Sequence, residues 1–315
     1  MAWVTWRQHR PQALTALGTL LVLAAAAVAT AVPVRAAFNR HPLAACLPPS
    51  ARAGCDIIVR HFQGEFATGV DSLRALVIVP ALVGVFVGAP LLAREFEHGT
   101  YRFAWTQAIT RPRWLLWKTL LLTAGTVAAA GALSAVTTWW RAPFDQFDAR
   151  IAPAAFDVEG LVVPAYAVFA LAVGVLAGLL LRRTVAAMTA TLAVFVATRF
   201  AVAHFLRPRY LPPLRDVGIG DDSVAHTRDW VLSAPLVDQS GQQITTARED
   251  LAILHAQHAG LDPHEYLAQL GWQRLVTYQP AGRFWSFQLI EAGIFVALAA
   301  AVVGAAVWTI RRVPA

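Results

Sequence analysis

Metal binding is the first chemistry to consider, because three histidines lie close together in one polar stretch: His255, His258 and His264. The i, i+3 spacing of His255 and His258 places both side chains on one face of a helix, and neutral imidazoles are good zinc ligands. The three residues follow none of the strict ligand spacings of zinc sites, and solvated surface histidines are common. We therefore expect no metal site in this chain.

Phosphate-binding and hydrolytic motifs are absent from the sequence. The only lysine, Lys118, follows a Trp-Leu-Leu-Trp stretch and not the glycine-rich loop that cradles phosphates in P-loop ATPases. The sequence also lacks the G-x-S-x-G turn of serine hydrolases and the H-E-x-x-H helix of zinc proteases. We expect no catalytic residue, no cofactor and no enzyme activity in this chain.

Two charged residues, Arg199 and Glu291, interrupt long apolar stretches. A lone charge within a membrane costs about 2.5–3.5 kcal/mol on insertion scales, and pairing with an opposite charge offsets part of this cost. Arg199 lies late in one stretch and Glu291 lies early in the next, so their depths match in neighbouring antiparallel helices. We predict that these two side chains form an intramembrane pair.

Thr184, Thr191 and Thr198 recur every seven residues, which places them on one face of a helix. They either bond to a neighbouring helix or line a transport path, and both interpretations stay open. Since the middle of the apolar stretches carries no charge, such a path suits lipophilic or amphipathic molecules better than ions or sugars.

Membrane-spanning helices must position all these residues. Hydrophobic residues make up 57% of the 315 residues and charged residues only 14%, against about 25% charged residues in an average globular domain. The apolar stretches are continuous and about 20 residues long, as spanning helices require and barrel strands do not. We predict an all-α polytopic membrane protein, with a single transmembrane domain over 1–315 and six spans at about 13–34, 75–93, 117–139, 161–181, 184–206 and 287–310.

Basic residues predict the orientation of these spans. They are much denser in 94–114 and at 182–183 than in the loops 35–74, 141–160 and 207–286, and short loops rich in arginine and lysine stay in the cytoplasm. We expect both termini to be cytoplasmic in the cell membrane. Topology then accounts for the net charge of +7 without nucleic acid. A cleaved signal peptide is the alternative for the first span, but its apolar stretch exceeds the 7–15 residues of such peptides.

The first expected outer loop contains both cysteines, Cys46 and Cys55. An outer compartment permits disulfides, and a bridge that closes such a short loop stabilises a fold by about 2–3 kcal/mol. We predict the bridge, and two unrelated thiols are the alternative.

The loop 207–286 carries the signals of two helices, and we expect it to be helical. Thr246 and Glu249 have the spacing of a capping box for a helix that runs to about residue 258, where Gly260 can end it. Asp262 followed by proline can open a second helix, which Gly271 would end.

Only one inner segment, 94–114, is long enough to dock a partner. Within it Tyr101, Trp105 and Ile109 recur every four residues and predict an apolar stripe on a short helix, which Thr100 can cap. An interfacial helix that lies on the lipid is the alternative interpretation.

Glu95 and Glu97 are the only acidic residues on the expected cytoplasmic side, and the positive-inside rule does not explain them. A basic groove on a partner would explain them by complementary charge.

This inner segment resembles a known family. The pattern Glu97-x-Gly99-Thr100, followed by Thr110-Arg111 and by Lys118 at the start of the next span, is similar to that of ABC-2 type exporter permeases. The stretches 93–114 and 278–285 are most similar to actinobacterial members. The six-span layout and the large outer loop also fit, so the resemblance covers the whole chain. One departure is Trp117, where many relatives have glycine, and we expect it to alter only local packing.

The resemblance implies a division of labour. A second permease copy, identical or different, would pair with this chain in the lipid, and separate ABC ATPase subunits would dock from the cytoplasm onto a coupling helix in 94–114. The residues that the resemblance assigns to this coupling are Glu95, Glu97, Gly99, Thr100, Tyr101, Trp105 and Arg111.

Two other classes of protein stay open. A non-transporting membrane subunit, such as a sensor or an immunity partner, would have the same spans. A membrane-bound enzyme would need a site in 207–285, where we find no convergent catalytic set. In every class, Gly84-x-x-x-Gly88 and Gly174-x-x-x-Gly178 predict close helix packing.

Overall fold

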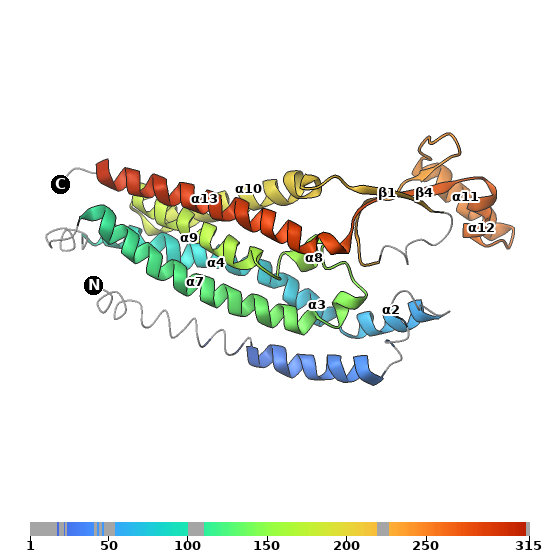
Figure 1. The fold of residues 1–315 in the computed structure, drawn as a ribbon, viewed down its shortest axis with the longest axis horizontal. Helices are drawn as coiled ribbons and strands as arrows, with labels where there is room; N and C mark the ends of the chain where they lie inside the picture. Colours follow the sequence, from blue (N-terminus) through green and yellow to red (C-terminus); the bar gives the residue numbers. More distant parts are fainter. Residues whose placement is uncertain are drawn as a thin grey trace.

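The protein is mostly helical. The computed structural model describes residues 18, 22, 24–40, 43, 46, 54–99, 110–218 and 227–312, and its long helices run side by side with a small sheet domain beyond one end (Figure 1). Within these residues, five helices are long and apolar enough to cross a membrane: Ala67–Glu97, Pro112–Arg141, Val162–Leu181, Thr184–Arg209 and Ala281–Arg312.

The expected first span, 13–34, lies partly outside the described residues. Its described part belongs to a helix over residues 24–40. Six spans therefore stay a prediction, whereas a polytopic helical membrane protein is observed.

Irregular turns interrupt two of the spans. The span Ala67–Glu97 comprises α3, a 3₁₀ turn, α4, the π turn η3 and α5. The span Thr184–Arg209 comprises α10, the π turn η5 and the 3₁₀ turn η6 (Arg207–Arg209). The bounds are α2 Cys55–Glu65, α3 Ala67–Arg74, α4 Val79–Val83, η3 Gly84–Gly88, α5 Ala89–Glu97, α7 Arg111–Arg141, α8 Pro153–Phe156, α9 Val162–Leu181, α10 Thr184–Ala201, η5 Val202–Leu206 and α13 Phe284–Arg312.

Helix α9 is the centre of the bundle. In its most apolar window 83% of the residues are buried, against 22–44% in the other four spans, and it packs against α5, α7, α10 and α13. The sequence of α9 has no charged residue, which suits a helix that is buried on all sides. The outer helices keep exposed apolar side chains such as Val185 on α10 and Leu289 on α13, as lipid contact requires.

Glycines bring α9 and the second expected span into close contact. A methyl group on Gly174 would lie 2.5 Å from the carbonyl oxygen of Gly84, and one on Gly178 would lie 2.6 Å from that of Ala89. A methyl group on Gly88 would likewise lie 2.7 Å from a carbonyl oxygen of α9. The predicted close packing of both G-x-x-x-G motifs is confirmed, and they pack against each other.

The bundle has two ends, which we name the loop end and the sheet end. At the loop end, comprising residues 94–99, 110–118, 182–184 and 311–312, α5 and α13 finish and α7 and α10 begin. At the sheet end, comprising residues 141–161, 199–218 and 227–291, α7 finishes and α13 begins. Figure 1 shows that the C-terminal end of α13 lies far from the strands.

The expected helical loop 207–286 contains a sheet as well as two helices. The strands are β1 Leu214–Gly218, β2 Trp230–Ser233, β3 Leu236–Val237 and β4 Gln273–Gln279, and the first three pair antiparallel with β4. The expectation was incomplete because the pairing joins residues about 60 positions apart, such as Leu214 and Tyr278, whereas helix caps are local signals.

Both helices of this loop form where their caps predict them, at α11 Thr246–His258 and α12 Pro263–Gln269. Asp262 caps α12 by accepting a bond from the Glu265 amide (3.1 Å), and Gly260 and Gly271 have the left-handed φ of 68° and 72°. The capping box is wrong, because the N-cap of α11 is Thr245 and its side chain makes no cap bond.

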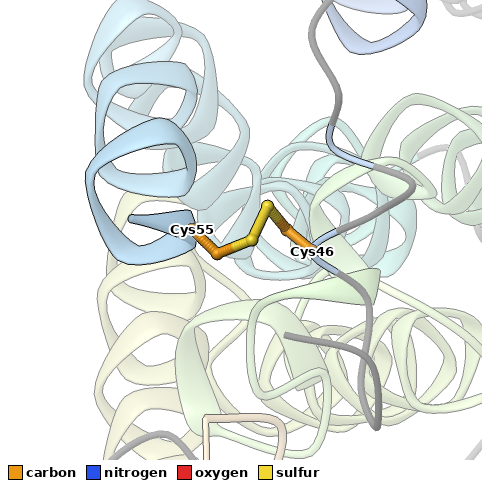
Figure 2. The surroundings of a disulfide bond; sticks show 2 residues. All are labelled: Cys46 and Cys55. Atoms are coloured by element: carbon orange, nitrogen blue, oxygen red, sulfur yellow. A yellow bond between two sulfur atoms is a disulfide. The ribbon is translucent and has the colours of Figure 1, made fainter. Parts of the chain in front are cut away.

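A disulfide joins Cys46 to Cys55, the first residue of α2 (Figure 2), with the two Cα atoms 5.4 Å apart. Both cysteines are buried in an apolar cluster with the helix 24–40. In this cluster the rings of Phe62 and Trp140 both stack on the ring of Phe144, with centroid distances of 5.1 and 5.3 Å. The bridge therefore ties residue 46 to the start of α2, and the aromatic rings of the cluster pack α2 against the end of α7.

Candidate functional site

The loop end holds two acidic residues, and both have partners within the chain. Glu95, near the end of α5, forms an ion pair with Lys118 on α7. The Lys118 side chain is buried (7% exposed), and its ammonium lies 5.2 Å from the ring centre of Trp114. Burial of a lone ammonium is costly, so Glu95 supplies the charge that Lys118 needs.

Glu97 caps a different helix. Its carboxylate accepts hydrogen bonds from the backbone amide of Thr184 (2.9 Å) and from the Thr184 hydroxyl (2.5 Å). Thr184 is the first residue of α10, and the N-cap residue Arg183 makes no side-chain cap bond. A carboxylate is favourable at a helix N-terminus because it faces free amides and the positive end of the helix dipole. Glu97 thus performs from α5 the function of a cap for α10.

A third contact joins the same two segments. Arg182 has a left-handed φ of 53°, and its guanidinium lies 5.3 Å from the ring centre of Phe96. Gly99 has a φ of 68°, which suits a residue without a side chain. Residues 94–99 are therefore attached to the start of α10 and to the start of α7.

These contacts account for the two acidic residues of the loop end within the chain itself. Glu95 and Glu97 are explained by Lys118 and Thr184, so their charge alone does not require an external partner. Of the other residues assigned to coupling, Thr100, Tyr101 and Trp105 lie outside the described residues, and Arg111 is described only as the first residue of α7.

The predicted pair of Arg199 and Glu291 is close at the sheet end, but it is not the main contact of either residue. Their shortest N–O distance is 3.5 Å. Arg207 binds Glu291 with both ends of its guanidinium, Nε to Oε2 at 2.8 Å and Nη2 to Oε1 at 2.6 Å. Both Arg207 and Glu291 are fully buried.

Three further residues complete this group. The hydroxyls of Tyr166 and Tyr210 donate to the two oxygens of Glu291, at 2.5 and 3.0 Å. The Asp157 carboxylate forms ion pairs with Nη2 of Arg199 at 2.6 Å and with Nη2 of Arg207 at 2.7 Å. Two carboxylates and two guanidiniums balance in charge. We name this group the Glu291 cluster: Asp157, Tyr166, Arg199, Arg207, Tyr210 and Glu291.

Sequence reasoning missed Arg207 because it follows the apolar stretch and was assigned to the outer loop. The π turn η5 lies between Arg199 and Arg207. A π turn adds one residue to a helical turn. Two residues eight positions apart on either side of it therefore lie on nearly the same face, as two residues seven positions apart do in a regular α-helix. An arginine eight residues after another is a usable signal only when that turn is known.

A second buried charge group lies beside the first. The carboxylate of Glu159, fully buried, accepts bonds from Nε of Arg141 (2.7 Å) and Nε of Arg150 (2.8 Å). Asp145 lies 3.5 Å from each of these arginines. We name this group the Glu159 cluster: Arg141, Asp145, Arg150 and Glu159.

The three threonines have different surroundings. Thr184 holds Glu97, as described above. Thr191 is buried, and its hydroxyl bonds to the Ala187 carbonyl of its own helix (2.6 Å). This bond and the packing against neighbouring helices account for Thr191 without a transport path. Thr198 is partly buried.

The histidines of the sheet domain do not assemble a metal site in the described part of the chain, which contains no group of three or more potential ligands. The ring of His255 lies 5.7 Å from the ring of Tyr266. The side chain of His264 is outside the described set.

Comparison with known proteins identifies the family. A family model described as ABC-2 membrane transporter related matches residues 17–207. No curated protein and no solved structure matches the chain. The matched part contains the loop end up to Thr184, the glycine contact between α9 and η3, and the sheet-end residues as far as Arg207. The chain therefore belongs to the ABC-2 membrane transporter related family, as a multi-pass membrane component of an ABC-2 type transporter.

Proposed function

We propose that this chain is the permease subunit of an ATP-driven exporter in the cell membrane, with the loop end and both termini in the cytoplasm. ABC-2 permeases in general work with a separate ABC ATPase, and the sequence of this chain has no nucleotide-binding motif. In this proposal the chain catalyses no reaction itself. The ATPase docks on 94–114 and supplies the energy.

The observation that carries the proposal is the attachment of residues 94–99 to two other spans. Glu97 joins the end of α5 to the start of α10, and Glu95 joins it to α7 through Lys118. A displacement of 94–114 by an ATPase would therefore act on three spans at once. It would also reach the bundle centre, because α5 and η3 pack against α9 through glycines.

The distribution of charge supports a lipophilic or amphipathic cargo. Within the described residues, the buried charges lie at the two ends of the bundle, in the Glu291 and Glu159 clusters and at Lys118. The middle of the spans is apolar, so a charged cargo would lose its hydration there without gaining a counter-charge.

A second permease copy and lipid are part of the proposal. The α10 side chains Val185, Val196 and Phe200 are 75%, 52% and 61% exposed. Apolar side chains exposed on a membrane helix contact lipid or another subunit, so this face is available to both.

A non-transporting subunit is the second candidate function, because one observation favours it. The Glu291 cluster joins α9, α10 and α13 through buried charges at the sheet end. A path that opens there would have to separate some of these contacts, whereas a sensor or an immunity partner would not.

The experiment that tests the proposal separates docking from coupling. The chain is co-expressed with a candidate ABC ATPase subunit, and the complex is reconstituted in liposomes. Glu97→Gln removes the charge that caps α10 and leaves the size of the side chain unchanged. We expect the ATPase to co-purify normally and the stimulation of ATP hydrolysis by the permease to fall severalfold.

The matched control is Glu65→Gln, which changes an exposed glutamate at the end of α2 and should preserve stimulation. Wild-type stimulation in a stably inserted Glu97→Gln variant would contradict coupling through this contact. If the wild-type chain binds the ATPase normally but the complex transports no lipophilic probe, the result would favour the non-transporting subunit.

A further inference from the structure

A cavity of about 330 Å³ lies at the sheet end, at the junction between the bundle and the sheet domain. Its wall combines acidic, basic and aromatic side chains from three segments: Asp145, Asp148, Arg150, Arg228, Phe284 and Trp285. Pockets of about this size hold small ligands or lipid headgroups. None of the contacts proposed above for transport uses this cavity.

In the described part of the chain, the acidic part of the wall has no ion pair shorter than 3.5 Å. The pKa of Asp145 is raised to about 7 by burial and by the nearby carboxylate of Glu159. Its nearest basic groups in the described part of the chain, on Arg141 and Arg150, are 3.5 Å away. Burial also raises the pKa of Asp148, whose Oδ1 accepts a bond from Gln63 at 2.6 Å. An ammonium group in the cavity would supply the close positive charge that these carboxyls need.

The basic part of the wall has donors to spare. Arg150 makes its ion pairs with Glu159 and Asp145 through Nε, and among the described residues its two Nη groups have no acceptor. Its guanidinium lies 4.0 Å from the ring centre of Phe284, so the ring holds it in place. Arg228 is exposed and forms no ion pair with any residue that the structure describes. Two guanidiniums of this kind suit a phosphate, which accepts several charge-assisted bonds.

The aromatic part of the wall places the cavity at a membrane boundary. Phe284 and Trp285 begin α13, and the Trp285 side chain is 54% exposed. Tryptophans at the ends of spans lie at the level of lipid headgroups. A ligand with acyl chains could therefore keep its chains in the lipid while its headgroup occupies the cavity.

We propose that this cavity binds a zwitterionic headgroup with an ammonium and a phosphate, carried by a phospholipid of the phosphatidylethanolamine class. The ammonium pairs with Asp145 and Asp148, and the phosphate pairs with Arg150 and Arg228. A simple anion would make no favourable contact with the two acidic groups, and a simple amine would make none with the two basic groups. The inference concerns binding and stands whether or not the chain exports a substrate.

The test measures binding of short-chain phosphatidylethanolamine to the purified full chain in detergent. Short-chain phosphatidylglycerol lacks the ammonium, and octylamine lacks the phosphate. We expect phosphatidylethanolamine to bind about tenfold more tightly than either, a difference of about 1.4 kcal/mol. Free phosphoethanolamine distinguishes the two sources of this headgroup. If free phosphoethanolamine binds as tightly as phosphatidylethanolamine, the assignment to a phospholipid would be overturned.

Variants locate the site. Asp145→Asn with Asp148→Asn should lower the affinity for phosphatidylethanolamine to that for phosphatidylglycerol, about tenfold. Arg228→Ala should weaken both phospholipids equally and leave octylamine unchanged. Arg228 is exposed, so this variant should fold even if the double variant does not.

The matched control is Arg215→Ala, which removes another exposed arginine, on β1, and should change no affinity. Unchanged binding of both phospholipids by Arg228→Ala would overturn the proposal, as would equal affinities for all three ligands in the wild type.

Discussion

The two ends of the bundle use charge in different ways. At the loop end, each contact joins one acid to one partner, and Glu97 is exposed. At the sheet end, ten residues form two neutral groups around the fully buried Glu159 and Glu291. Exposed pairs contribute about 0–1 kcal/mol, whereas the loss of one partner from a buried pair costs about 3–5 kcal/mol. The exposed Glu97 contact can therefore rearrange at little cost, while the buried groups of the sheet end hold their helices together.

The largest expected effect is the loss of stability on Glu291→Gln. Arg207 would stay buried without its bidentate partner, so we expect the free energy of unfolding to fall by about 3–5 kcal/mol. Thermal unfolding of the detergent-solubilised chain measures this, and Glu65→Gln should leave the transition unchanged. A transition temperature equal to that of the wild type would break the contrast between the two ends.

An exchange of charges between Arg199 and Glu291 tests which arginine is the main partner of Glu291. The sequence suggests that Arg199→Glu combined with Glu291→Arg keeps an ion pair. The structure predicts that this double variant is no more stable than Glu291→Gln, because Arg207 would then face a second positive charge at the position of its carboxylate partner. Recovery of wild-type expression and stability would show that Arg199, and not Arg207, is the main partner.

Removal of the disulfide should have the next largest effect. Cys46→Ala combined with Cys55→Ala removes the bridge that ties residue 46 to the start of α2, and we expect a loss of about 2–3 kcal/mol. Reduction of the wild-type protein should lower its unfolding temperature by the same amount and have no effect on the double variant. A thiol-labelling assay on the non-reduced, unfolded wild type should detect no free cysteine, since the structure describes both as bridged.

The pH dependence of stability tests the Glu159 cluster. Asp145 has a pKa of about 7 in the folded chain, above its usual 3.8, so the folded state binds this proton more tightly than the unfolded state. Its contribution to stability is full below about pH 4 and is lost as the pH rises to about 7. The groups that face it are Arg141, Arg150, Glu159 and Asp148.

The measurement compares unfolding temperatures of the wild type and Asp145→Asn from pH 4.5 to 7.5. Since the asparagine does not titrate, the wild type should lose several degrees relative to the variant over this range, and the contributions of other groups cancel. Parallel curves would mean that Asp145 has an ordinary pKa and that the sheet-end burial does not constrain its charge.

The smallest expected change in stability follows Glu97→Gln at the loop end. An exposed cap contact contributes little to folding, so the unfolding temperature should stay within experimental error of the wild type, even though coupling to the ATPase falls. Thr184→Val, which removes the hydroxyl donor but keeps the backbone amide, should reduce coupling less. Strong destabilisation by Glu97→Gln would show that the loop end is as rigid as the sheet end.

Local signals in the sequence predicted much of the fold. Continuous apolar stretches predicted spans because each must satisfy its backbone within one helix in lipid. Asp262, Gly260 and Gly271 act on residues within one turn, so their helix boundaries could be read directly. Close helix packing at each G-x-x-x-G motif was also predictable, whereas the contact of the two motifs with each other came from the structure.

The pairing of residues far apart in the chain could not be predicted in this way. The sequence proposed Arg199 for Glu291, but the tertiary structure supplies Arg207 through the π turn, and adds Asp157, Tyr166 and Tyr210. It likewise assigns Glu95 to Lys118 and Glu97 to Thr184.

The sequence by itself determined which residues must be in the membrane and which charges need a partner there, because the cost of transfer into lipid depends on composition. Only the tertiary structure decided which partners they have, because buried ion pairs form between the side chains that helix packing brings within about 3 Å, irrespective of their separation along the chain.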